Sequence, residues 1–210
     1  MDYRNYQESR DLSWKILIFQ NVRSLPVRIS DICLSYGINI YNYSKNAELI
    51  SKLKANELKI GNDGFTTIVN GKPIIFFDDS KSPQRSRFTI AHELGHILLG
   101  HVGLYDLINR EPSSEDNPIE QAANVFASRL LAPACVMWGL NVHTSEEIMR
   151  YCNLTYSAAA FRAERMEQLY SREKEFIQNR GKSCFLMSPL EKKVYQQFSD
   201  FIRENRCEEF

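Results

Sequence analysis

The sequence predicts an α+β fold in which a small three-stranded sheet packs on a buried helix and an all-helical part follows. Strand and hairpin patterns are confined to residues 38–78, whereas helical patterns dominate the rest of the chain. The chain has 210 residues, of which 43% are hydrophobic and 25% are charged. That length and composition are typical of a globular protein with a hydrophobic core of its own.

The elements expected before the hairpin are two short helices and one strand. Apolar residues at helical spacing predict a helix over about 11–23. A second helix is predicted over about 29–36, and Gly37 should end it. Residues 38–43 alternate between apolar and polar side chains, which predicts the first strand.

A β-hairpin is the clearest local pattern. Residues 65–69 and 73–78 are separated by Asn70 and Gly71, which suit the two positive-φ positions of a type I′ turn. Residues 74–77 are all apolar, so we expect the second hairpin strand to be covered on both faces.

A helix that is apolar nearly all round is predicted after the hairpin. Ser82 and Pro83 suit its N-cap and first position, and Gly100 should end it after Leu99. Such a helix belongs in the interior of the protein. Later helices are expected over about 118–131, 145–152, 156–172 and, with a clear amphipathic pattern, 189–206.

Charge and composition exclude several classes of function. The 26 basic and 26 acidic residues balance, so nothing attracts the whole chain to nucleic acid. No apolar segment reaches the roughly 20 residues that cross a bilayer, and no signal peptide is recognisable. The five cysteines are scattered without a C-x-x-C motif, which favours free thiols. We therefore expect a cytoplasmic protein without a membrane partner.

The buried helix contains the sequence His92-Glu93-Leu94-Gly95-His96, an H-E-x-x-H motif. Residues four apart lie on one helical face, so His92 and His96 can hold a single Zn²⁺ ion. Glu93 is rotated by about 100° and should act as a general base rather than as a ligand. The alternative is a core helix whose polar groups make only structural hydrogen bonds, but burying Glu93 without a function would be costly.

A catalytic zinc needs a third protein ligand and an open position. A metzincin would have a histidine six residues after His96, where this chain has Val102, so that class is excluded. His101 follows the expected helix end at Gly100 and is badly placed as a ligand. For His101 we favour a structural or capping role, or a hydrogen bond to one of the zinc ligands.

Glu120 on the next helix is the better candidate for the third ligand. Asn124 lies one turn later on the same face and could orient Glu120 or a zinc-binding histidine. A solvated glutamate near a helix N-terminus explains Glu120 equally well. Glu115 and Asp116 in the preceding loop are weaker alternatives.

Two blocks of sequence resemble the ImmA/IrrE family of metallo-endopeptidases. Residues 88–101 resemble the active-site helix of that family, and residues 120–133 resemble its second signature. The resemblance covers about residues 10–170. Ala122 departs from the family pattern, which often has a second acidic residue there. Family members resemble the thermolysin-like class, so the resemblance implies that Glu120 is the third ligand.

The resemblance implies a cofactor, an activity and a partner. Zn²⁺ would be held by His92, His96 and Glu120, although Mn²⁺ or Fe²⁺ also suits such ligands. Glu93 would take the proton of the attacking water. Characterised family members cleave helix-turn-helix transcriptional repressors, which implies a regulatory, anti-repressor endopeptidase with a specific protein substrate.

Two parts of such a mechanism stay open at the level of sequence. The transition state needs a further hydrogen-bond donor, for which His101, His143 and Tyr156 are candidates. Arg129 lies off the Glu120 face and is less favoured. Residues 73–78 could pair with an extended substrate if that strand lies at the sheet edge.

The chain is expected to have three parts. Residues 1–135 would form a zincin-like metallopeptidase core, and residues 136–180 a helical docking or cover region continuous with it. Residues 181–210 would form an extension that either packs on the core or mediates dimerisation, and the oligomeric state is left open.

Two competing functions stay open. A degenerate peptidase could bind and sequester a repressor without cutting it. A one-component transcription factor with a metal sensor would bind DNA directly, but acidic and basic residues nearly balance over 144–172, so no direct nucleic-acid partner is expected.

Overall fold

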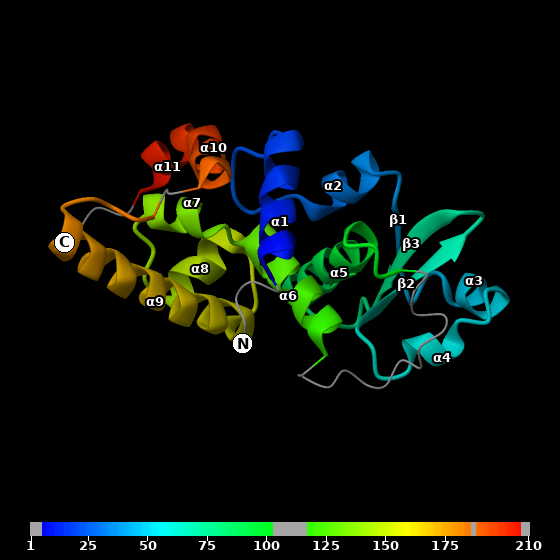
Figure 1. The fold of residues 1–210 in the computed structure, drawn as a ribbon. Coiled ribbons are helices and arrows are strands. Elements are labelled where there is room, and N and C mark those ends of the chain that lie inside the picture. Colours follow the sequence, from blue (N-terminus) through cyan, green and yellow to red (C-terminus); the bar gives the residue numbers. More distant parts are fainter. Residues whose placement is uncertain (1–5, 103–116, 186–187, 207–210) are drawn as a thin grey trace. The chain divides into compact units, whose positions relative to one another are not determined.

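The computed structural model describes residues 6–102, 117–185 and 188–206, and its fold is α+β as predicted (Figure 1). The chain divides into two compact units. The first unit comprises Met1–Ser9 and Arg28–Ala127, and the second comprises Arg10–Val27 and Ser128–Phe210. The predicted three-part organisation, with boundaries at 135 and 180, stays a prediction. Among the described residues, no helix has both the length and the apolar character that crossing a membrane requires.

The sheet and its covering helices belong to the first unit. In chain order its elements are α2 (Ile29–Ser35), β1 (Asn39–Asn42), α3 (Ala47–Lys52), α4 (Asn56–Lys59), β2 (Gly64–Val69), β3 (Lys72–Phe77) and α5 (Pro83–Leu98). Two further helices, α1 (Gln7–Phe19) and α6 (Pro118–Leu131), have residues in both units. The sequence patterns gave no indication of α3 and α4.

The hairpin forms at the predicted turn. Asn70 and Gly71 have φ values of 51° and 74°, the two positive values that a type I′ turn needs. β2 runs antiparallel to β3, and β1 runs parallel to it, in the order β1-β3-β2. β3 is therefore the central strand.

The position of β3 settles two expectations about it. Because both edges of β3 are paired, the condition for substrate pairing at residues 73–78 is not met, and β2 is the edge strand on that side. The expectation that β3 is covered on both faces is confirmed. Ile75 is fully buried on the face toward α5. The opposite face lies in a cluster formed by Tyr43, Ile50, Ala55, Phe65, Ile74 and Phe76.

The central helix α5 begins and ends at the predicted signals. The Ser82 side chain accepts a hydrogen bond from the Arg85 backbone at 3.3 Å, and Pro83 occupies the first turn. Gly100, with φ of 75°, follows the helix and adopts the left-handed conformation that favours glycine. The helix lies against β2 and β3 (Figure 1).

Gly95 lets α5 and α6 approach closely. A Cβ atom at this position would lie 2.9 Å from Phe126 Cδ1 and 3.3 Å from Ala123 Cα. Any side chain larger than hydrogen would therefore press on the backbone of α6. This close approach brings the first turn of α6, with Glu120, to the histidine face of α5.

The second unit is helical. Its remaining elements are α7 (Ala134–Gly139), α8 (Ser145–Cys152), α9 (Tyr156–Arg180), α10 (Pro189–Gln197) and α11 (Ser199–Asn205). The buried Arg162 side chain in α9 donates two hydrogen bonds, of 2.9 and 2.7 Å, to the Ala132 carbonyl. This pair fixes the chain at the end of α6.

The C-terminal extension packs within the second unit. The helix predicted over 189–206 is divided at Phe198 into α10 and α11. Gly139 in α7 leaves room for Tyr195 and Ile202, whose nearest atoms would lie 2.7 and 2.8 Å from a Cβ there. Trp138 stacks on Phe185 with ring centroids 5.1 Å apart. The described residues of the extension therefore contribute to the core of this unit.

The cysteines fit the expectation of free thiols. The four described ones, Cys33, Cys135, Cys152 and Cys184, are all free and buried. Cys207 lies outside the described residues.

Candidate metal centre

Three side chains from α5 and α6 converge in the first unit. His92 Nε2 lies 2.9 Å from His96 Nε2 and 3.1 Å from Glu120 Oε2. His96 Nε2 lies 3.4 Å from Glu120 Oε1. The three side chains are 16%, 12% and 28% exposed, respectively, so the group is partly accessible to solvent. The structure thus brings together the three residues that the sequence and the resemblance suggested as ligands.

The spacing of these atoms suits a zinc ion. Tetrahedral bonds of about 2.0–2.1 Å place ligand atoms about 3.3 Å apart, close to the distances in this group. Two imidazoles and one carboxylate are also the ligand set of a catalytic zinc site with one open position. The residues present therefore fit the metal that the family implies.

The other ring nitrogen of each histidine has its own partner. His92 Nδ1 lies 2.9 Å from Asn124 Oδ1, and since an amide oxygen only accepts, Nδ1 donates. His96 Nδ1 lies 3.2 Å from His101 Nδ1. These contacts leave both Nε2 atoms directed at Glu120. Asn124, expected to orient either Glu120 or a histidine, contacts His92.

Mutual contacts shift the pKa values of the metal-free group. Burial opposes protonation of His92, but the hydrogen bond with Glu120 and the nearby carboxylate charges outweigh it and raise the pKa of His92. Contacts with the imidazole rings, that of His92 first and that of His96 second, hold the pKa of Glu120 well below its usual range. Burial and the neighbouring His96 lower the pKa of His101 to about 4. The group is therefore arranged around a carboxylate that stays ionised.

Thr66 is a site residue that the sequence analysis missed. Its hydroxyl donates a 2.7 Å hydrogen bond to Glu93 Oε2, and the residue is only 4% exposed. Gly64, two residues earlier on the same strand, permits this approach, because a Cβ there would lie 2.9 Å from the Phe76 carbonyl oxygen and would collide with Thr89. Strand β2 thus holds the carboxylate of Glu93 in place. Strand alternation alone could have shown that Thr66 faces the helix, but not what it touches.

The other candidate donors have different surroundings. His143 and Tyr156 belong to the second unit. His143 stacks on Tyr170 with ring centroids 4.5 Å apart, and Tyr156 is 61% exposed. Their assignment as transition-state donors stays a prediction. Glu115 and Asp116 lie outside the described residues.

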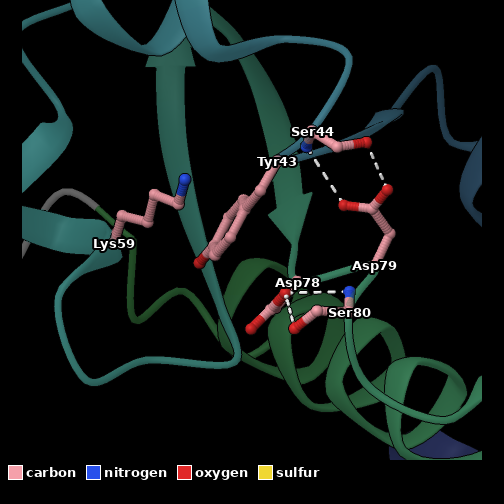
Figure 2. Close-up of a pocket in the computed structure, with 6 residues that line it drawn as sticks. All are labelled: Tyr43, Ser44, Lys59, Asp78, Asp79 and Ser80. Carbon is pink, nitrogen blue, oxygen red and sulfur yellow. Dashed lines mark hydrogen bonds between the residues drawn. The ribbon is translucent and has the colours of Figure 1, made fainter.

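A separate acidic pocket lies where β3 leads into α5. Figure 2 shows that Asp79 is turned toward Ser44, and Asp78 toward Ser80. Hydrogen bonds from these serines lower the pKa of both aspartates. The pocket is lined by Tyr43, Ser44, Lys59, Asp78, Asp79 and Ser80. Since its carboxylates bind neighbouring backbone and hydroxyl groups, we assign them to shaping the turn before α5.

The fold and the site together define a class of protein. Two histidines of an H-E-x-x-H motif with a glutamate from another helix are a ligand set found in zinc metallopeptidases.

Residues 35–164, more than half of the chain, match the peptidase family described as the IrrE N-terminal-like domain. The chain belongs to this family of zinc metallopeptidases. No curated protein and no solved structure shows a significant match to it.

Proposed function

We propose that the protein is a zinc-dependent endopeptidase that cleaves a helix-turn-helix transcriptional repressor and so acts as an anti-repressor protease. The observation that carries the proposal is the convergence of His92, His96 and Glu120, with Glu93 one residue from the first of them. Family membership supports the peptidase activity. The substrate class is supported by the resemblance of residues 88–101 and 120–133. A cytoplasmic site of action follows from such a substrate.

The chemistry is divided between the metal and the chain. A zinc ion held by these three ligands would polarise the scissile carbonyl and make a water molecule more acidic. Glu93 accepts the proton of the attacking water and delivers it to the leaving amine nitrogen. Since the Thr66 hydroxyl donates to Oε2 of Glu93, we assign the proton transfer to Oε1. The hydrogen bond to Asn124 keeps the His92 ring in its ligating orientation.

We place the substrate along β2. An extended peptide can add to a sheet at an edge strand, and β2 is an edge strand of this sheet. Thr66 lies in β2 and contacts Glu93, so a peptide on this edge would pass close to the general base. The edge of β2 thus replaces residues 73–78 as the expected pairing site.

The test combines metal analysis with a cleavage assay. Elemental analysis of the purified protein should find one zinc per chain. Incubation with repressors encoded beside its gene should yield fragments, and a chelator should prevent them. Glu93→Gln should keep the zinc and lose cleavage, because the ligands are intact and the base is not. A stable complex with the repressor and no fragments would favour the sequestering module instead.

A further inference from the structure

The position of His101 is fixed by the way α5 ends. Gly100 N donates to the Ile97 carbonyl at 3.2 Å, and His101 N donates to the His96 carbonyl at 2.9 Å. Together with the left-handed Gly100, these two bonds make a Schellman motif. In this motif the residue after the glycine lies beside the residue five positions earlier. His101 is therefore directed to His96 by the helix terminus itself.

An unusual pair of side chains occupies this motif. The two positions commonly make an apolar contact. Here the Nδ1 atoms of His96 and His101 lie 3.2 Å apart, with the ring planes inclined at 66°. Two imidazole nitrogens can form a hydrogen bond only if one carries a hydrogen and the other does not. The contact therefore constrains the tautomers of both rings.

The arrangement of the three proposed ligands determines which imidazole ring donates the hydrogen bond. His96 Nε2 faces His92 Nε2 and the carboxylate of Glu120, so Nε2 is the atom available to a metal. The hydrogen of a neutral His96 must then lie on Nδ1, and His101 Nδ1 accepts it. His101 in turn carries its own hydrogen on Nε2.

We propose that His101 is a positioning residue that selects the metal-binding tautomer of His96 and holds its ring, using the helix-ending motif at Gly100. The inference rests on the proposed metal site. It gives the two histidine ligands different supports, since His92 is held by Asn124 of α6 whereas His96 is held by the end of its own helix. A neutral imidazole acceptor orients His96 without adding a charge.

The first test removes the acceptor. His101→Leu keeps an apolar contact in the motif but cannot accept a hydrogen bond, whereas His101→Gln offers an amide oxygen. Loss of such a support typically weakens metal affinity about 10–100-fold. We expect that loss for His101→Leu and recovery of most of it for His101→Gln, measured by Zn²⁺ competition with a chromophoric chelator. The matched control is Lys182→Leu, directly after the left-handed Gly181 that ends α9.

The second test moves His101 without changing it. A Cβ at Gly100 would meet nothing within 4 Å, so Gly100→Ala acts only through strain at positive φ. We expect it to weaken Zn²⁺ binding in the same direction as His101→Leu. Gly181→Ala has the same backbone conformation at another helix end and should leave Zn²⁺ affinity unchanged.

A third measurement does not need metal. ¹⁵N NMR of the metal-free protein should show His96 with its hydrogen on Nδ1, and His101→Leu should give a mixture of tautomers. An unchanged tautomer together with unchanged Zn²⁺ affinity in His101→Leu would overturn the inference. So would a loss as complete as that of His96→Ala, which would make His101 a ligand. If the natural protein binds no Zn²⁺, the proposed function fails, and the NMR result still decides the role of His101.

Discussion

Gly95 offers a quantitative test of how the site is assembled. In Gly95→Ala the new methyl group would lie 2.9 Å from Phe126 Cδ1 and 3.3 Å from Ala123 Cα. The Phe126 ring can rotate, but Ala123 Cα belongs to the backbone, so α6 must shift by a few tenths of an ångström. Overpacking of this kind costs about 1–3 kcal/mol, of which the better helix propensity of alanine returns about 0.5–1 kcal/mol.

The strain should appear in metal affinity as well as in stability. Metal–ligand distances tolerate changes of only about 0.2 Å, and a shift of α6 carries Glu120 away from the two histidines. If binding must overcome about 1–2 kcal/mol of this strain, the Zn²⁺ dissociation constant rises about 5–30-fold. The expected result is a variant that folds and binds Zn²⁺ more weakly, although no ligand has changed.

Chelator competition and thermal unfolding measure the two effects separately. The control is Gly139→Ala in the second unit, where a Cβ would lie 2.7 Å from Tyr195 and 2.8 Å from Ile202. It should lower the melting temperature and leave Zn²⁺ affinity unchanged. Zn²⁺ binding in Gly95→Ala as tight as in the natural protein would refute the idea that this glycine sets the ligand geometry.

Three further outcomes are expected. Thr66→Val should lower turnover of the proposed repressor substrate about tenfold or more, because a hydrogen bond to the charged Glu93 is lost. Thr67→Val on the opposite face of β2 should not lower it, and equal turnover in both variants would contradict a role of Thr66 in holding Glu93. Zn²⁺ affinity should fall by up to about tenfold per pH unit on acidification, because the pKa of His92 is raised above 6.5 and its proton must leave before the metal binds. A Zn²⁺ affinity that does not change between about pH 5 and 7 would contradict this expectation. Burial raises the pKa of the Cys33 thiol to about 12, so iodoacetamide should not label it at neutral pH until the protein unfolds, as peptide mass mapping can check.

Local signals made parts of the fold predictable. The Asn70-Gly71 turn and the boundaries of α5 depend on backbone preferences of neighbouring residues, which a sequence displays directly. Helices α3 and α4 have only six and four residues, too few to show a helical period. The pairing of β1 with β3 joins strands separated by those helices, and no local pattern encodes it.

The residues of the site also divide into those that local sequence patterns indicate and those that they do not. The spacing of His92 and His96 places both on one helical face, so the sequence was sufficient for that pair. Glu120 needed the family resemblance, because a glutamate in the first turn of a helix has an ordinary electrostatic explanation. Alternation along β2 could have placed Thr66 on the side that faces the helix, but no local pattern shows that its partner is Glu93. The contact between His101 and His96 could have been expected, because a glycine after a helix often forms a motif that brings these two positions together.

The composition of β2 has a consequence for the behaviour of the protein at high concentration. Edge strands of natural sheets are commonly protected from pairing with other molecules by charged residues or proline. Gly64–Val69 contains neither, and the Ile68 side chain is half exposed. A second copy of this strand can therefore compete for the edge of β2 along which we propose that the substrate binds. Raising the concentration of the protein should lower the rate at which each molecule cleaves the proposed substrate, and dilution should restore that rate.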